Sequence, residues 1–347
     1  MNILYLGDSS PSATSMHRAG ALRRLGQDVT VRDPWSIVMA HCRHRLVDWL
    51  HYHSGYAALQ RTMVEWLRGS AADIARADIV WVDGGEFFGP AAMTALRGMT
   101  GARFVLFNHD DPTGSRDGGR FRSLRAALPW YDVLVAVREP SEREYRQLCR
   151  GKVVRVWRGY DEVCHAPGLA ADPIPPEFRS EVAFIGTWMR GEGREEVVLE
   201  LARRGIDVAI WGGRWPRAPG WRRLRPLWRG PAIGGADYVS AIRGAKLCLG
   251  LLSKGNRDLH TTRSMEIPYA GGVLLAQRTP EHEALYRDGS EAVLWSTVDE
   301  AATRVRALLA DSAGLERIRQ AGMARVRGNR VGNEDMCRTI LAAACDG

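Results

Sequence analysis

The chain repeats one local pattern along most of its length: a short apolar segment, then a polar loop, then a segment with helical spacing. Residues 3–6 run into GDSS, residues 79–82 run into DGGEFF, and residues 104–107 run into NHDDPTG. Each apolar segment has the length of a buried strand. Strands that alternate with helices in this way form parallel, doubly wound sheets. The pattern therefore predicts an α/β fold.

The pattern changes over residues 153–178 and then starts again. This region contains ADPIPPEF, a proline-rich stretch that suits a linker, and EVAFIG then predicts a new strand. A chain of 347 residues is also longer than one typical domain. We therefore expect two Rossmann-like doubly wound domains, at 1–165 and 178–327, joined by a linker at 166–177.

Charge and cysteine content narrow the class of protein. The net charge of +8 suits acidic partners such as nucleotides, phosphorylated substrates, nucleic acid or an anionic membrane surface. The six cysteines include no CxxC pair, which favours reduced thiols over a disulfide framework or a structural zinc site. The N-terminal MNILYLGDSS reads as a first strand rather than a signal peptide, and no apolar run is long enough to cross a bilayer. These features predict a cytoplasmic protein.

Ligands of open α/β sheets bind beyond the carboxyl ends of the strands, so the loops at those ends are the candidate sites. The most unusual of these regions is RSMEIPYAGG. Arg263 and Glu266 stand one helical turn apart, and Pro268 and Gly271–Gly272 end the helix before the next strand. Such an i, i+3 pair is commonly a surface salt bridge, so the pair alone leaves its role open.

Several segments, in this order, resemble the group 1 glycosyltransferases of the GT-B fold, and most closely their CgeB-like (spore-maturation protein) branch. FIGTWMRGEGREEVVLELARRGIDVAIWGGRW resembles the opening of the family's C-terminal domain, and RGPAIGGADYVSAIRGAKLCLGLL resembles the segment with the nucleotide-base loop. TTRSMEIPYAGGVLLAQRTPEHEALYRDGSEAVLW resembles the donor-binding element, and WRGYDEVCHAPG resembles the crossing between domains. The resemblance implies an acceptor domain and a donor domain facing a central cleft, with a C-terminal helix at 328–347 packed back on the N-terminal domain.

The resemblance assigns the donor site to the second domain. A nucleoside-diphosphate sugar presents a ribose diol, which suits a carboxylate, and a diphosphate, which suits cations and backbone N–H groups. Glu266 would bind the ribose and Arg263 would face the phosphates. GT-B enzymes need no obligatory metal, so no metal or other cofactor is expected. The donor-site residues implied are Gly186, Thr187, Arg190, Arg194, Ile233, Lys254, His260, Thr261, Thr262, Arg263, Ser264 and Glu266.

The reaction also needs a group on the acceptor side. In an inverting transfer, a carboxylate or a histidine deprotonates the acceptor hydroxyl. NHDDPTG brings His109, Asp110 and Asp111 to one strand end. Asp111 or Asp110 is preferred to His109, because repulsion between adjacent carboxylates raises the pKa of one of them. Asp8 is the rival base, Glu86 is a weaker candidate, and an Asx-turn is the structural alternative for the loop.

Other interpretations receive less support. HCRHRLVDWLHYH at 41–53 gathers four histidines and a cysteine, but its spacing favours an amphipathic helix bordering the cleft over a zinc site. GGRWPRAPGWRRLRPLWRGP interleaves arginine with tryptophan and suits an exposed basic connection. Peripheral membrane contact stays open, and nucleic acid is not an expected partner. No GxGxxG or GxxxxGK[ST] motif supports an oxidoreductase or a kinase.

The expected activity is therefore transfer of a sugar from a nucleoside-diphosphate sugar to an acceptor hydroxyl. Two rival functions remain: a non-hydrolysing nucleotide-sugar 2-epimerase, and a non-catalytic nucleotide- or nucleic-acid-binding protein. The sequence leaves open the nucleotide base, the sugar, the acceptor, the stereochemistry and the oligomeric state.

Overall fold

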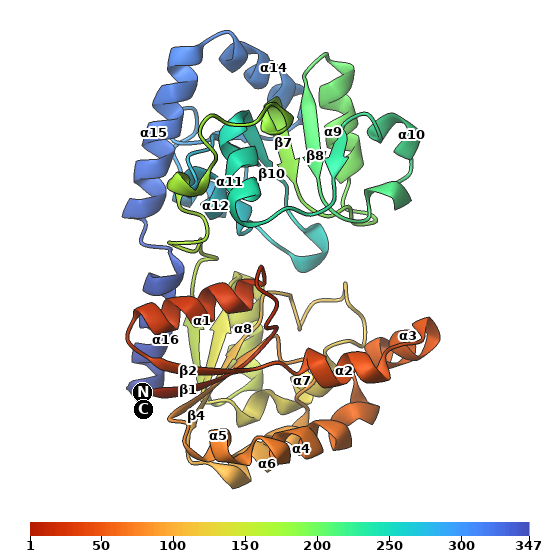
Figure 1. Cartoon of the computed structure of the whole chain (residues 1–347), viewed down its shortest axis with the longest axis vertical. Coiled ribbons are helices and arrows are strands. Elements are labelled where there is room, and N and C mark those ends of the chain that lie inside the picture. The colour runs from red at the N-terminus through yellow and green to blue at the C-terminus, as the bar shows by residue number, and fades with distance from the viewer. Residues whose placement is uncertain (347) are drawn as a thin grey trace. The chain divides into compact units, whose positions relative to one another are not determined.

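Two parallel sheets of six strands organise the computed structural model, which describes residues 1–346 (Figure 1). One sheet lies in unit 1, which comprises Met1–Trp157, Gly255–Arg257 and the C-terminal segment from Asn333. The other lies in unit 2, which comprises Arg158–Lys254 and Asp258–Gly332. The predicted pair of doubly wound α/β folds is confirmed. The units divide after Trp157, ahead of the linker predicted at 166–177.

In unit 1 the strand order is β2-β1-β3-β4-β5-β6, and all neighbouring strands are parallel. The carboxyl ends of β1, β3 and β4 therefore lie next to one another along one edge. The strands are β1 (Asn2–Leu6), β2 (Asp28–Arg32), β3 (Ile79–Asp83), β4 (Arg103–Phe107), β5 (Val133–Ala136) and β6 (Lys152–Arg155).

Side chains along these strands alternate between two hydrophobic clusters. In β1, Leu4 and Leu6 lie in one cluster, whereas Ile3 and Tyr5 lie in the other. Successive side chains of a strand point to opposite faces, so this alternation shows that both faces of the sheet are covered. A sheet buried on both faces needs apolar residues at nearly every strand position, which explains the continuous apolar runs in the sequence.

Helices cover both faces of this sheet. Leu22 of α1 and Ile340 of α16 join the cluster that contains Tyr5, whereas Met63 of α4 joins the cluster that contains Leu4. The helices of unit 1 are α1 (Thr14–Arg24), α2 (Trp35–His41), α3 (Arg45–Ser54), α4 (Gln60–Gly69), α5 (Ala71–Ala75), α6 (Pro90–Met99), α7 (Arg122–Ala127), α8 (Glu139–Leu148) and α16 (Asn333–Cys345).

In unit 2 the strand order is β12-β11-β10-β7-β8-β9, again parallel throughout. The strands are β7 (Ser180–Ile185), β8 (Val208–Trp211), β9 (Trp228–Gly230), β10 (Ala245–Gly250), β11 (Leu274–Gln277) and β12 (Val293–Trp295). The helices are α9 (Arg194–Arg203), α10 (Trp221–Leu224), α11 (Gly235–Gly244), α12 (Arg263–Tyr269), α13 (Pro280–Leu285), α14 (Val298–Leu309) and α15 (Ser312–Gly328). Within residues 1–346, no helix combines the length and apolar character needed to cross a membrane.

The C-terminal helix α16 completes the core of unit 1. Met336 and Ile340 lie in the same cluster as α1, and Arg24 Nε lies 2.7 Å from Glu334 Oε1. The helix begins at Asn333, later than the boundary predicted at 328, because α15 runs on to Gly328.

The contribution of α16 to unit 1 can be measured with one core substitution. Ile340 is fully buried, so Ile340→Ala should lower the free energy of unfolding by about 2–5 kcal/mol through lost contacts and a new cavity. Urea unfolding of unit 1 measures the change. Thr339→Ala, on the exposed side of the same helix, is the matched control. Equal stability of the two variants would contradict this packing.

Candidate functional site

A cavity of about 390 Å³ opens at the carboxyl ends of β1, β3 and β4 in unit 1. The loops that follow these strands supply most of its wall, because adjacent parallel strands end at the same edge. Four of the predicted acceptor-side residues lie together here. The lining residues are Asp8, Ala13, Thr14, Ser15, Trp35, Asp83, Gly84, Glu86, Asn108, His109, Asp110 and Arg120.

Two arginines neutralise the carboxylates on one side of this cavity. Arg120 donates to Glu86 at 2.6 Å and to Asp110 at 2.8 Å, and Arg116 donates to Asp110 at 3.2 Å. Burial alone would raise the pKa of Asp110, but the two arginines hold it below its ordinary value. The expectation that adjacent carboxylates would raise one pKa is therefore wrong for Asp110, because each carboxylate has its own arginine partners.

Asp111, the preferred catalytic base of the sequence analysis, does not line the cavity. Its side chain is nearly fully buried and accepts from Arg257 Nε at 2.5 Å, from Thr113 Oγ1 at 3.0 Å and from the backbone N–H of Gly114 at 3.1 Å. Burial would raise the pKa of Asp111, but Arg257 and Arg138 hold it below its ordinary value. This geometry fits a carboxylate that fixes its loop, and a role of Asp111 as the base stays a prediction.

Asp8 and His109 are placed to meet a ligand in the cavity. Asp8 is half-buried, its Oδ1 accepts from the backbone N–H of Ser10 at 2.8 Å, and it makes no ion pair within residues 1–346. His109 Nε2 lies 3.3 Å from Thr14 Oγ1. Arg138 donates to the backbone carbonyl of His109 at 2.6 Å, which fixes this loop beside the cavity.

A buried ion pair supports the floor of the cavity. Arg18 Nη2 lies 2.6 Å from Asp83 Oδ2, the Tyr5 hydroxyl also donates to Asp83, and the Arg18 guanidinium stacks 4.4 Å from the Phe107 ring centre. Burial and the Asp83 charge raise the pKa of Tyr5 far above its ordinary value, so Tyr5 stays a neutral donor. The sequence did not predict this group, because its members stand up to 102 positions apart. The one local indication was that Asp83 lies at the end of a strand, next to the candidate loops.

In unit 2 the predicted Arg263–Glu266 pair exists, but it is buried rather than a surface pair. Glu266 is 3% exposed, its Oε2 accepts from Tyr238 Oη at 2.7 Å and from Arg263, and its Oε1 lies 3.7 Å from His165 Nε2. Burial would raise the pKa of Glu266, but Arg263 and His165 hold it below its ordinary value. Arg263 Nε also donates to the carbonyl of Ile185 at 3.0 Å, so α12 begins at the carboxyl end of β7.

Three other predicted donor residues are buried and hold the loops of unit 2. Arg194 donates to the carbonyl of Thr187 at 2.6 Å, and His260 Nδ1 lies 2.5 Å from Glu281 Oε2. Ser264 Oγ accepts from the backbone N–H of Thr261 at 3.0 Å. The side chains of Arg194, His260 and Ser264 therefore hold loops of unit 2, and their contacts with a donor stay predictions.

The remaining donor residues differ in exposure. Arg190, after β7, and Lys254, after β10, are exposed, and these two strands are neighbours in the sheet. Gly186, Thr187, Ile233 and Thr262 are half-buried, and Thr261 is buried. Gly212 explains the close packing after β7, because a Cβ there would lie 2.0 Å from the carbonyl oxygen of Gly186.

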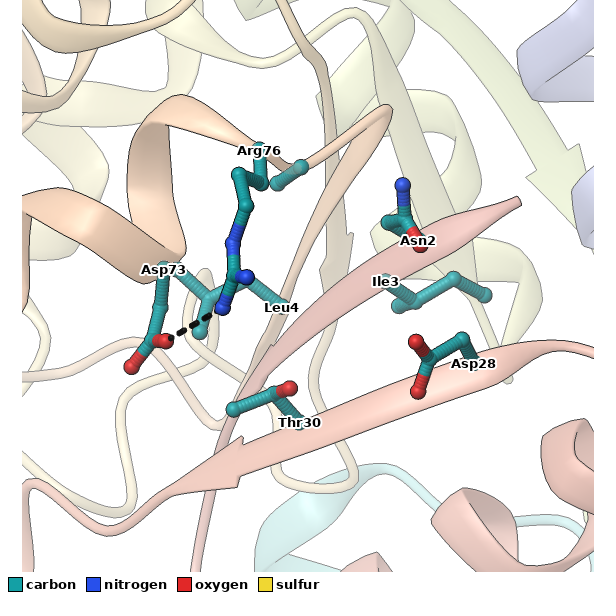
Figure 2. A pocket seen from close by; sticks show the side chains of 8 residues that line it. Asn2, Ile3, Leu4, Asp28, Thr30, Asp73 and Arg76 are labelled. Carbon is teal, nitrogen blue, oxygen red and sulfur yellow. Dashed lines mark ion pairs between the residues drawn. The ribbon is translucent and has the colours of Figure 1, made fainter.

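A second cavity in unit 1 lies at the opposite edge of the sheet (Figure 2). It measures about 120 Å³ and lies beside the amino ends of β1 and β2, near Asn2 and Asp28. Figure 2 shows Arg76 reaching toward Asp73, with 3.5 Å between Arg76 Nη2 and Asp73 Oδ1. Ligands of parallel α/β sheets bind at the carboxyl edge, so the larger cavity at that edge is the better candidate.

Two sequence features are resolved by packing. Trp215 is fully buried, and Trp221 and Trp228 pack against each other with ring centres 5.6 Å apart, so the arginine–tryptophan segment does not display its indoles as a stacking surface. For the histidine-rich segment 41–53, the described part of the chain contains no group of three or more His, Cys, Asp or Glu side chains that could hold a metal.

The buried carboxylate of Glu266 predicts a pH-dependent stability. Its folded-state pKa lies below the ordinary value of 4.5, so the ionised form stabilises the fold above that value, and this contribution is lost as the pH falls through the folded-state pKa. Glu266→Gln should lower the free energy of unfolding at pH 7 by about 1–3 kcal/mol. The difference in this free energy between the wild type and the variant should be smaller at about pH 3. Urea unfolding at both pH values tests this.

Glu139→Gln is the control for that experiment, because Glu139 is an exposed carboxylate paired on the surface of α8. Its effect should stay within about 0.5 kcal/mol at either pH. A Glu266→Gln variant with the same small, pH-independent effect would refute the buried ion network.

Part of the chain is similar to a known protein family. Residues 194–342 match a family model described as glycosyl transferase-like, and this segment includes α12 with Glu266. No curated protein sequence matches the chain. The resemblance to glycosyltransferases is confirmed at this level, whereas membership of the CgeB-like branch stays a prediction.

Solved structures share the fold over the whole chain. Sucrose-phosphate synthase from Thermosynechococcus elongatus is 14% identical, with a TM-score of 0.64, covering 99% of this chain and 100% of that one. HepE from Anabaena, in complex with UDP-glucose, is 12% identical, with a TM-score of 0.66 and 99% of each chain covered. Trehalose 6-phosphate synthase from Burkholderia multivorans is 15% identical, with a TM-score of 0.67, covering 99% and 98%. The chain therefore has the GT-B fold, and its glycosyl transferase-like domain supports sugar transfer as its activity.

Proposed function

We propose that the protein transfers a sugar from a nucleoside-diphosphate sugar, bound by unit 2, to a hydroxyl of an acceptor held in the cavity of unit 1. The observation that carries this proposal is the carboxylate of Glu266, buried at the start of a helix within the glycosyl transferase-like segment. The separate cavity at the carboxyl edge of the first sheet supports a second substrate. We assign the protein to the CgeB-like branch as part of the same proposal.

Donor binding would rearrange the Arg263–Glu266 pair. A diphosphate offers Arg263 a second anionic partner, and the Arg263 side chain is 31% exposed, so a ligand can approach it. When Arg263 turns toward the phosphates, Glu266 gains room for the ribose hydroxyls while Tyr238 still donates to it. Arg263 then pairs with the diphosphate, while Glu266 keeps the hydrogen bond from Tyr238, gains those of the ribose hydroxyls and still lies 3.7 Å from His165 Nε2.

The leaving diphosphate would be neutralised by side chains rather than by a metal ion. Arg263 would act with Lys254 and Arg190, both exposed in loops that follow neighbouring strands. The structural neighbours support uracil as the base, because HepE was solved with UDP-glucose and a Burkholderia vietnamiensis neighbour is a UDP-forming synthase. The six cysteines are all unbridged, which suits a reducing cytoplasm.

The acceptor cavity favours hydroxyl-rich acceptors without phosphate. Its one lining arginine, Arg120, already bridges Glu86 and Asp110, whereas Asp8 adds an unneutralised carboxylate. A phosphorylated acceptor would meet net negative charge here, and a neutral or amine-bearing sugar would not. Trp35 supplies an apolar wall for the acceptor. Asp8 or His109 would then take the proton of the attacking hydroxyl.

A panel of nucleotides tests the donor side. UDP, GDP, dTDP, ADP and CDP should be compared by thermal shift, and UDP should raise the melting temperature most. No shift with any diphosphate, together with steep salt-dependent binding to DNA or RNA, would instead support a nucleic-acid-binding protein. Interconversion of sugar nucleotides without an acceptor would support the 2-epimerase alternative.

Glu266→Ala should weaken binding of the nucleotide sugar by about 10²-fold, because two charge-assisted hydrogen bonds to the ribose are lost. Isothermal titration with UDP-glucose measures the change. The control is Glu291→Ala, which removes another buried carboxylate of unit 2, one whose ion-pair partners, Arg287 and Arg325, lie outside α12. Unchanged affinity in a folded Glu266→Ala protein would refute the donor assignment.

Substitutions on the acceptor side should separate turnover from donor binding. If Asp8 or His109 is the base, Asp8→Asn or His109→Gln should lower kcat by about 10²–10⁴-fold while the donor Kd stays nearly unchanged. Asp111→Asn should mainly lower stability, because it weakens the contact with Arg257. A large loss of kcat for Asp111→Asn, with full stability and normal activity of the other two variants, would restore Asp111 as the base.

A further inference from the structure

Helix α3 presents its apolar side away from the body of unit 1. Leu46, Trp49 and Leu50 are 69%, 53% and 53% exposed, and Val47 is 37% exposed. No residue of this ten-residue helix is buried. At about 100° per residue these four side chains fall within one arc of about 160° around the helix. They therefore form one exposed patch, which we call the α3 patch (Leu46, Val47, Trp49 and Leu50).

The orientation of α3 is the reverse of an ordinary surface helix. Its polar side contacts unit 1: Tyr52 Oη donates to Asp117 Oδ1 at 2.9 Å, and Arg120 lies 5.9 Å from the Tyr52 ring centre. Leu46 and Leu50 are four positions apart and therefore lie on one face, about 160–200° from the face of Asp48 and Tyr52. An amphipathic helix normally buries its apolar side, so this arrangement leaves the α3 patch without a covering surface among residues 1–346.

The charges around the α3 patch favour an anionic surface. Near the α3 patch, Arg43 and Arg45 are basic, Asp48 is acidic, and four histidines stand at 41, 44, 51 and 53. Arg61 is basic as well, but Glu65 pairs with it at 3.2 Å. Arg43 and Arg45 are both exposed. Leucine and tryptophan flanked by arginine are the composition of helices that lie in the interface of an anionic bilayer.

We propose that the α3 patch docks unit 1 on an anionic lipid bilayer, with the apolar side chains in the interface and the arginines near the lipid phosphates. Met39 of α2 is also 57% exposed, and α2 begins at Trp35, which lines the acceptor cavity. Helix α3 follows α2 along the chain (Figure 1), so α2 links the segment that would contact the bilayer with Trp35 of the cavity wall. The docking does not depend on the identity of the donor or of the reaction.

Sedimentation with vesicles tests the proposal on the full-length protein. Binding to phosphatidylcholine vesicles that contain phosphatidylglycerol should exceed binding to pure phosphatidylcholine, and it should weaken between about 0.1 M and about 0.5 M salt. Leu46→Ser/Leu50→Ser should lower the partition coefficient by about tenfold or more. Arg43→Gln/Arg45→Gln should lower it by about fivefold per arginine, for anionic vesicles only.

The matched control is Leu148→Ser, which removes an exposed leucine of α8 and should leave vesicle binding unchanged. All these side chains are exposed, so the variants should keep the wild-type melting temperature. Absence of vesicle binding, equal binding to neutral and anionic vesicles, or wild-type binding by Leu46→Ser/Leu50→Ser would overturn the proposal. A dimer in solution that the same double variant dissociates would also overturn it, because the patch would then belong to an interface between two copies.

Discussion

Pairing of carboxylates with arginine at the carboxyl edges of the two sheets is the constraint on which the site architecture depends. Charged groups placed at these partly buried edges must be compensated, since an unpaired buried charge costs several kcal/mol. Asp83 pairs with Arg18, Asp110 with Arg120, Asp111 with Arg257, and Glu266 with Arg263. The arginine-rich composition therefore serves the interior of each unit as well as its surface.

This pairing also separates structural carboxylates from those that can meet a ligand. A carboxylate held by an arginine at a lowered pKa is a weak base, so Asp110 and Asp111 suit the fixing of a loop better than proton transfer. Asp8 and His109 line the same cavity, and Asp8 makes no ion pair among residues 1–346. Glu266 is paired too, but its partner Arg263 keeps partial exposure, which gives that pair a way to open toward an anionic ligand.

Much of the fold follows from the sequence, because strand length, continuous apolar character and alternation with helices are local properties. The positions of the loops at the strand ends follow as well, and they correctly brought Asp8, Glu86, His109 and Asp110 to one edge. The pairing of charges does not follow, since it joins distant residues. Arg257 reaches Asp111 across 146 positions, which no local pattern indicates.

Burial and orientation were the other properties that the sequence could not supply. The i, i+3 spacing of Arg263 and Glu266 predicted a pair, but its burial depends on Tyr238 and on His165 of a distant loop. The apolar pattern of α3 predicted an amphipathic helix, but the contact between Tyr52 and Asp117 turns its apolar side outward. The sequence pattern shows which side of a helix is apolar, whereas tertiary contacts decide which side is buried.

Acceptor-dependent release of nucleoside diphosphate is the most direct test of sugar transfer. The purified protein should be incubated with UDP-glucose and other nucleotide sugars, with and without a panel of unphosphorylated and phosphorylated sugar acceptors. We expect that UDP release requires an acceptor, that a glycosylated product forms in equal amount, and that unphosphorylated acceptors react faster. Formation of an epimerised nucleotide sugar without an acceptor and without diphosphate release would contradict it.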